Sequence, residues 1–351
     1  MYKYSFFLLG ILSACGRNNI NCCGPSSREG SSYDGGKDSS DGGGGEGISF
    51  LPGPGNPSDP DSSNPLPPPA GVLTAADWDD NLYTGLLNSY FQNEVSDALK
   101  QSKIESLDTV SRWVASPSAI DLNLLIDTTG SMGDEISFLK SEIESIVEEV
   151  KETNPSLPIR FSFVAYKDRE DSYLTKIQNF VTDILNFKIQ LRTLTAEGGG
   201  DFPEALEEAL KSLNQLNWSE DSSIKMSFLM ADAPPHQADY QSFIDEVATA
   251  KGQGIKIYPV ASSGVDADTE FLMRYAAQQS GARYMFLTDD SGVGESHKQP
   301  SIPCYKVQLL REVILRMIQS EIQGTFVEAE PLNVLRSVGL FEGNRCVIPQ
   351  S

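Results

Sequence analysis

Two aspartates in this sequence follow apolar runs, where a strand of a buried sheet would place them at a sheet edge. Asp127 follows Leu-Leu-Ile, and Asp232 follows Leu-Met-Ala. Thr129 and Ser131 come after Asp127 at alternate positions. In a tight turn this spacing directs one carboxylate and two hydroxyls towards one point, and Asp232 supplies a second carboxylate from another strand. Such oxygen ligands suit a hard divalent cation, which keeps some of its waters.

These residues also have structural explanations. Ser131 could cap the helix that follows, with Asp134 three residues on as in a capping box, and we expect Ser131 to serve both purposes. Asp127 and Asp232 could each simply form a turn. Because both aspartates coincide with the hydroxyl spacing, we favour one bound ion, Mg²⁺, with Mn²⁺ or Ca²⁺ as alternatives. A lone His236 beside Asp232 has no His or Cys near it in sequence and is expected to be structural.

The elements that must position these residues alternate between apolar runs and helical patterns. Six runs are predicted as strands, over 120–126, 159–166, 177–181, 224–231, 255–261 and 282–287. Six helices are predicted, over 132–150, 183–191, 203–216, 240–253, 268–279 and 305–322. This alternation predicts an α/β fold with a doubly wound, mostly parallel sheet flanked by helices. Ligands of such sheets bind at the carboxyl ends of the strands.

The segment Ile126–Met132 resembles the metal-ion-dependent adhesion site of von Willebrand factor A domains, whose fold is Rossmann-like. The order of elements over about 119–323 is similar to that family. The phrases Gly198–Glu204 and Ala231–His236 resemble a subgroup of extracellular and kinase-linked A domains. The resemblance implies that a protein partner supplies an acidic side chain to an open position on the cation.

The same resemblance implies a further ligand from the middle loop, which is a Thr in many family members. Here Asp201 is the best-aligned position, and Thr195 is the alternative. An extra carboxylate at Asp201 would raise the affinity for the cation. It would also weaken the pull on an acidic partner, because it neutralises part of the charge of the ion.

The first residues form a targeting signal. One cation, Lys3, precedes the short apolar run Phe6–Leu12, which is too short to span a bilayer as a helix. Leu12–Gly16 resembles the bacterial lipobox, which implies cleavage before Cys15 and attachment of lipid to that residue. The expected location is therefore the cell envelope, lipid-anchored, on the outer membrane where there is one. An ordinary secretory signal is the alternative.

The rest of the chain divides by composition. Residues after the signal are rich in Gly, Ser, Asp and Pro, which favours a disordered tether. Helical spacing around Tyr90 and Leu99 predicts a helical segment, with Trp78 and Trp113 as core anchors. The expected parts are a signal peptide (1–14), a lipidated Cys15 and tether (15–71), a helical preface (72–117), the A-type domain (118–325) and a C-terminal extension (326–351).

Charge and cysteines narrow the function further. The 351 residues carry a net charge of −22, which argues against a nucleic-acid partner. Cys304 and Cys346 flank the C-terminal segment and could form a disulfide outside the cytoplasm. Closing that loop would contribute about 4 kcal/mol in the chain-entropy model. Two unpaired thiols are the alternative.

The sequence favours a membrane-anchored lipoprotein with a cation-dependent protein-binding domain, used for adhesion or assembly. One alternative is a scaffold whose cation only stabilises the fold. The other is a metal-dependent hydrolase, since carboxylate metal sites can hydrolyse phosphoesters. We expect no enzymatic activity, because no Ser/His/Asp set or Cys/His pair is evident in the sequence.

Overall fold

The structure, a computed structural model, describes residues 68, 71–78, 84–104, 113–220, 222–300, 302–343 and 345–347. The chain divides into two units, residues 1–60 and 61–351, and all described residues belong to the second. The expected signal peptide, the lipidation site Cys15 and nearly all of the expected tether lie outside the described residues.

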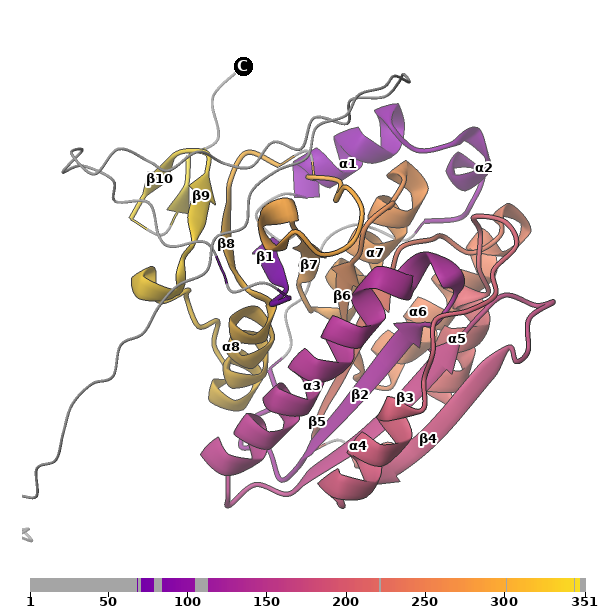
Figure 1. Ribbon diagram of the computed structural model, residues 1–351. Helices are drawn as coiled ribbons and strands as arrows, with labels where there is room; N and C mark the ends of the chain where they lie inside the picture. Colours follow the sequence, from indigo (N-terminus) through magenta and orange to yellow (C-terminus); the bar gives the residue numbers. More distant parts are fainter. Residues whose placement is uncertain are drawn as a thin grey trace, which may run out of the picture. The chain divides into compact units, whose positions relative to one another are not determined.

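A sheet of nine strands runs through the described part of the chain, in the order β4-β3-β2-β5-β6-β7-β1-β8-β9 (Figure 1). The strands β3, β2, β5, β6 and β7 are parallel, and β4, β1 and β9 are antiparallel to their neighbours. The bounds are β1 Thr74–Trp78, β2 Ile120–Asp127, β3 Ile159–Tyr166, β4 Thr175–Val181, β5 Ile224–Ala231, β6 Lys256–Ala261, β7 Tyr284–Leu287, β8 Tyr305–Leu309 and β9 Arg336–Val338.

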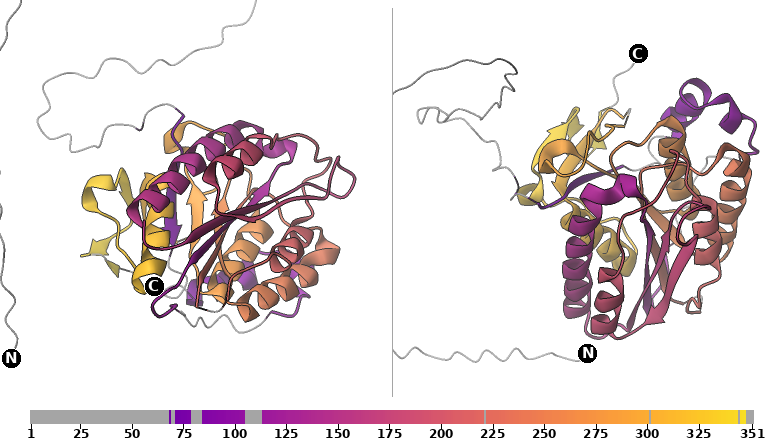
Figure 2. Two further views of the ribbon diagram at one scale, coloured as in Figure 1. Left: turned by 90° about the horizontal axis from the view of Figure 1, so that it is seen from below. Right: turned by 45° about the vertical axis from the view of Figure 1, so that its right-hand side comes forward.

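Helices cover both faces of this sheet (Figures 1 and 2). One face packs against α3, α4 and α8, and the other packs against α5, α6 and α7, with α1 on α7. The bounds are α1 Thr84–Asn93, α2 Asp97–Lys100, α3 Gly133–Thr153, α4 Ile184–Arg192, α5 Leu206–Asn214, α6 Tyr240–Gly252, α7 Ala267–Ser280 and α8 Leu310–Gln323. The predicted doubly wound, mostly parallel α/β fold is confirmed.

The central strands show why the apolar runs are nearly continuous. All residues of β2 and of β5 are buried. In β2, Leu124 and Ile126 belong to the core under α3 and α8, whereas Leu125 belongs to the opposite core. A strand covered on both faces is therefore mostly apolar along its length. The polar side chains that β2 does bury are hydrogen-bonded: Asn123 donates to Ser162 Oγ at 2.9 Å, and Asp121 accepts from Arg160 at 2.8 Å.

The first described strand corrects the prediction of a helical preface. Helices α1 and α2 lie where the helical spacing predicted them, but Thr74–Trp78 is a strand, which pairs with β7 and with β8. Trp78 is a core anchor as predicted, at 1% exposure, whereas Trp113 is 36% exposed. The prediction for Trp113 was wrong: its ring covers the Nζ of the buried Lys256, which lies 4.3 Å from the ring centroid, and leaves its other side exposed.

The predicted last helix also begins later than expected. Tyr305–Leu309 forms β8, and α8 starts at Leu310. The alternation of Tyr305, Lys306 and Val307 between apolar and polar is typical of a strand. Because the strand runs straight into an amphipathic helix, the helical pattern hid the boundary between them.

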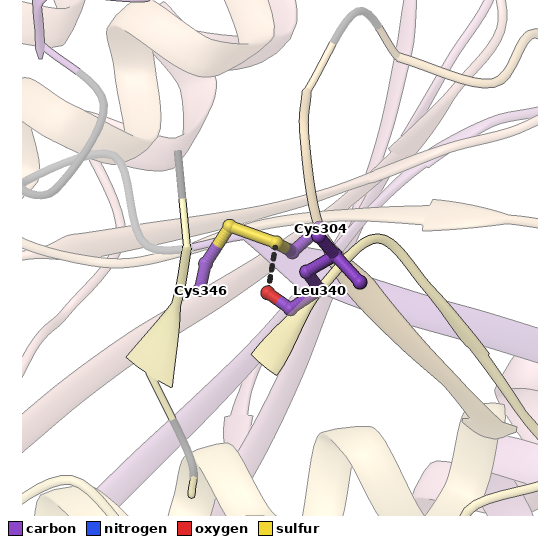
Figure 3. Close-up of a disulfide and its surroundings, with 3 residues drawn as sticks. All are labelled: Cys304, Leu340 and Cys346. Atoms are coloured by element: carbon purple, nitrogen blue, oxygen red, sulfur yellow. Dashed lines mark hydrogen bonds between the residues drawn. A yellow bond between two sulfur atoms is a disulfide. The ribbon is translucent and has the colours of Figure 1, made fainter. Parts of the chain in front are cut away.

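A disulfide joins Cys304 and Cys346, whose Cα atoms lie 5.7 Å apart (Figure 3). It ties the start of β8 to a small hairpin, β10 Phe341–Glu342 with β11 Arg345–Cys346. Cys304 Sγ also lies 3.2 Å from the carbonyl oxygen of Leu340. A disulfide sulfur has no proton to donate, so this is a packing contact.

None of the helices in the described ranges is long and apolar enough to cross a membrane.

Candidate functional site

The carboxyl ends of two neighbouring strands bring the predicted residues together. Asp127 is the last residue of β2, and Asp232 directly follows β5. The two strands pair in parallel, with Ile126 opposite Met230. Both aspartates are buried, at 0% and 3% exposure. The topology therefore places two carboxylates side by side at one sheet edge, at low solvent exposure.

The hydroxyls after Asp127 converge on its carboxylate. Thr129 donates its backbone N–H to Asp127 Oδ1 at 2.9 Å and its hydroxyl to the same oxygen at 2.7 Å. The hydroxyls of Thr129 and Ser131 lie 3.2 Å apart. A carboxylate and two hydroxyls thus share one small region, as the alternating spacing predicted.

The second oxygens of both aspartates are left open. Within the described residues, Asp127 Oδ2 and Asp232 Oδ1 are buried and accept no hydrogen bond. The hydroxyls of Tyr166 and Ser131 act to lower the pKa of Asp127 and Asp232 respectively, but neither makes a hydrogen bond to these two open oxygens. A buried polar atom without a partner costs about 1–3 kcal/mol, and more when the group is charged.

Electrostatics show what these carboxylates lack. Burial and the charge of Asp127 raise the pKa of Asp232 to about 7. Burial also raises the pKa of Asp127, although the hydrogen bonds from Thr129 act in the opposite direction. Low dielectric and like charge both disfavour ionisation, whereas a nearby cation favours it. The site is therefore built so that an added positive charge would be stabilised.

Ser131 does not cap the following helix, contrary to expectation. It lies in the 3₁₀ turn Gly130–Met132, and the residue that caps α3 is Met132, which makes no side-chain capping bond. The extra turn moves the start of α3 beyond Ser131. Its hydroxyl is therefore directed to Thr129 and Asp232 instead of the helix N–H groups.

The middle loop presents a residue that the sequence interpretation did not select. Asp201 and Thr195 are both exposed, and their role as ligand stays a prediction. Glu204 is 2% exposed and its Oε2 has no hydrogen-bond partner within the described part of the chain. Burial and the charge of Asp127 raise the pKa of Glu204 to about 9. Glu204 therefore lies close enough to Asp127 and Asp232 for their charges to contribute to its raised pKa.

Glycines allow this loop to approach closely. A Cβ on Gly199, whose φ is +72°, would lie 2.9 Å from Glu204 Oε1 and 3.3 Å from Thr129 Cβ. A Cβ on Gly130 would lie 2.8 Å from the carbonyl oxygen of Gly198. Larger residues at 130 or 199 would push the loop away from the aspartates, which explains why glycine occupies these positions.

Two further polar groups surround the site. His236 Nε2 lies 2.8 Å from Asp168 Oδ1, so His236 pairs with a carboxylate. Lys167 is fully buried at the end of β3, and burial lowers its pKa while Glu197 and other carboxylates oppose that effect. No sequence pattern indicated Lys167, because a lysine after a strand is usually solvated.

The donor set fits a hard cation in chemistry. No three or more His, Cys, Asp or Glu side chains within the described ranges are grouped as around a metal ion. The candidate set therefore depends on the hydroxyls of Thr129 and Ser131 as much as on the two aspartates. Carboxylate, hydroxyl and water oxygens are the ligands that Mg²⁺ accepts.

Comparisons with known proteins identify the domain. A family model described as the von Willebrand factor A domain matches residues 121–295. The alpha-protein kinase vwkA of Dictyostelium discoideum is 28% identical over 163 residues, 45% of this chain and 26% of the kinase. Human von Willebrand factor A domain-containing protein 7 is 32% identical over 142 residues, 40% of this chain and 15% of that protein.

Among solved structures, the crystal structure of the conserved hypothetical protein BatB from Bacteroides thetaiotaomicron covers 58% of this chain and 100% of its own, with 11% identity and a TM-score of 0.41. The chain spans about a quarter or less of the length of the two sequence relatives. The family match, together with the nine-stranded sheet of the present protein, shows that the chain is a von Willebrand factor A domain protein. The domain is matched over residues 121–295.

Proposed function

We propose that the protein binds one divalent cation, Mg²⁺ with Mn²⁺ or Ca²⁺ as alternatives, and uses it to hold a protein partner. The ligands proposed are Asp127, Thr129, Ser131 and Asp232, with Asp201, or alternatively Thr195, from the middle loop. The observation that carries the proposal is the pair of buried carboxylate oxygens, Asp127 Oδ2 and Asp232 Oδ1, that accept no hydrogen bond within the described residues. When bound, the ion would offer an open position to an Asp or Glu of the partner.

The side chains of this chain would orient the ligands. Thr129 fixes one oxygen of Asp127 through two hydrogen bonds, so the other oxygen stays directed away from the backbone. Ser131 lies near Asp232 and favours its charged form. Asp201, the favoured middle-loop ligand with Thr195 as the alternative, is exposed and is followed by Phe202, which is 44% exposed. The exposed Phe202 ring, next to Asp201 in sequence, would give a protein partner apolar surface to cover.

We also propose that Cys15 carries a lipid that anchors the protein in the cell envelope, at the outer membrane where there is one. The support is the lipobox-like Leu12–Gly16. The full-length protein is expected to partition into detergent, and Cys15→Ala to abolish this. An aqueous wild-type protein would remove this part of the proposal and leave the cation site untouched.

Calorimetric titration of the full-length protein with Mg²⁺ and Mn²⁺ tests the cation site. Asp127→Asn is expected to abolish binding, since it removes charge and keeps the size of the side chain. Asp245→Asn is the matched control, because Asp245 is an exposed residue of α6. Wild-type affinity in the control together with loss in Asp127→Asn supports the proposal, whereas equal binding by all three proteins contradicts it.

A partner search then separates binding from the alternatives. Pull-down from envelope extracts with and without EDTA should recover a protein only when the cation is present and Asp127 is intact. If the cation binds and raises stability but no such protein is recovered, the scaffold interpretation replaces this one. We propose no catalytic role, and phosphoester hydrolysis lost in Asp127→Asn would reverse that.

A further inference from the structure

One buried lysine next to the site is not used by the proposed function. Lys167 directly follows β3, at the sheet edge that carries Asp127 and Asp232. It is fully buried. Its ammonium donates hydrogen bonds to two backbone carbonyl oxygens, those of Thr128 and Glu197. A buried ammonium is costly unless hydrogen-bonded or paired, so its contacts are expected to have a purpose.

The two carbonyls belong to different segments of the site. Thr128 lies in the turn after β2, between Asp127 and Thr129. Glu197 lies in the loop 193–205, between α4 and α5, which carries the Gly-rich stretch and Glu204. One side chain thus bonds to both of the segments that line the site, although they are far apart in sequence.

The backbone joins the same two segments. Glu197 N–H donates to the carbonyl oxygen of Thr128 at 3.1 Å, and Gly130 N–H donates to that of Gly198 at 3.0 Å. The Thr128 carbonyl therefore accepts from both Glu197 and Lys167, and the Glu197 carbonyl accepts from Lys167. Without the lysine, the Glu197 carbonyl would lose this donor next to a buried turn.

Further contacts hold both the ammonium and the backbone of Lys167 in place. The ammonium lies 5.3 Å from the centroid of the Tyr173 ring. The Tyr173 hydroxyl lies 2.7 Å from Thr128 Oγ1, and the backbone N–H of Lys167 donates to Leu174 at 3.1 Å. Both ends of Lys167 are therefore held, and the ammonium cannot turn to solvent without breaking several contacts.

We infer that Lys167 is a positioning residue that holds the loop 193–205 against the turn after β2, so that the site is formed before any cation binds. The inference deepens the proposed function and rests on it only in naming the cation. A preformed site loses less conformational freedom on binding, which increases affinity.

Hydrogen–deuterium exchange of the metal-free full-length protein tests this. Lys167→Met removes the ammonium and keeps the apolar stem. We expect amides of 195–204 to exchange about tenfold faster, because the lost donor opens the loop locally. Amides of β2 and β5 should exchange as in the wild type, and Lys167→Arg, which keeps charge and donors, should restore most of the protection. Mg²⁺ should bind Lys167→Met about tenfold more weakly.

Unchanged exchange of 195–204 in Lys167→Met would overturn the inference. So would faster exchange across β2 and β5 as well, which would make Lys167 a general stabiliser. If the inference holds while wild-type protein binds no Mg²⁺ or Mn²⁺, the proposed function fails and the loop contact stands.

A measurement on folded wild-type protein covers the case in which Lys167→Met does not fold. The Lys167 ammonium should give a slowly exchanging NMR signal in lysine-¹⁵N-labelled, metal-free protein, and Lys167→Arg should lack that signal. If the two spectra are identical, the ammonium is in contact with solvent and the inference is wrong.

Discussion

Buried carboxylates lie at opposite edges of the sheet, and they differ in what surrounds them. At the amino end of β6, Glu321 of α8 is fully buried and accepts hydrogen bonds from Lys256 Nζ at 2.6 and 2.9 Å. It also accepts from the Tyr258 hydroxyl at 2.5 Å. At the carboxyl edge, Asp127 and Asp232 each keep one oxygen with no donor in the described part of the protein.

The comparison shows that burial of an acid does not by itself mark a binding site. The group at Glu321 contains its own cation, so its charge is balanced within the fold. The pair at Asp127 and Asp232 has hydroxyl neighbours, and the nearby Lys167 hydrogen-bonds to carbonyls. A site for a ligand is a place where the fold leaves a charge unbalanced.

The largest expected effect on stability is at the amino end of β6, where Lys256 balances the charge of Glu321. Glu321→Ala should lower the free energy of unfolding by about 3–5 kcal/mol, because it leaves the Lys256 ammonium buried without its partner. Urea denaturation measures this. The double variant Lys256→Met with Glu321→Leu should recover most of the loss, since apolar residues replace the pair. A small loss in Glu321→Ala would mean that the two edges do not differ in this way.

The next effect is at the open edge. Mg²⁺ at about 100 times its dissociation constant should raise the wild-type free energy of unfolding by about 2.7 kcal/mol and leave Asp127→Asn unchanged. In metal-free buffer, Asp127→Asn should lose no more than about 1 kcal/mol, because the substitution also relieves repulsion from Asp232. A metal-free loss as large as that of Glu321→Ala would show that Asp127 is a structural residue.

The smallest effect concerns a carboxylate at the open edge that does have a cationic partner. Glu135 in α3 lies 3.0 Å from His297 Nε2, and Asp289 lies 2.9 Å from His297 Nδ1. Burial lowers the pKa of His297, but hydrogen bonds and charges of Glu135 and Asp289 outweigh this and raise it above the ordinary value of 6.5.

A raised histidine pKa contributes stability that is fully present below about pH 6.5 and is lost as pH rises through the folded-state value. We expect about 1 kcal/mol, as for hydrogen bonds to a charged group. Urea unfolding at about pH 6 and at about pH 8.5 measures this contribution. His297→Gln is the comparison, because it should lack this dependence of the free energy of unfolding on pH. If the free energy of unfolding depends on pH equally in both proteins, the charge of His297 does not contribute to stability.

The sequence predicted the centre of the fold better than its margins. The strand at 224–231 was predicted with its observed bounds, and the strand ending at Asp127 within one residue. Both are long apolar runs closed by a carboxylate. The strand Thr74–Trp78 was missed, because its two small alanines and one aspartate show no strand pattern. Its conformation depends on strands far along the chain, which a local pattern cannot show.

Only part of the candidate site could be predicted, again because some of its contacts join segments that are distant in sequence. The spacing of Asp127, Thr129 and Ser131 is local, so the turn could be inferred from it. Glu204 stood within the Gly-rich phrase, yet its burial depends on the approach of that loop to Thr129. The inferred role of Lys167 likewise depends on backbone carbonyls of two other segments. Every residue has a backbone carbonyl, so the amino-acid sequence does not indicate which carbonyls a lysine will contact.

The position of β1 has a consequence for synthesis. Thr74 bonds to Thr288, 214 positions later, and the neighbour on its other side is β8. A chain made from its amino terminus must therefore keep its first strand unpaired until nearly the whole domain has emerged. During that time both edges of β1 lack their partners and are open to other strands. Folding of this domain should accordingly be slow and sensitive to chaperones, since its closing contacts are the most distant ones.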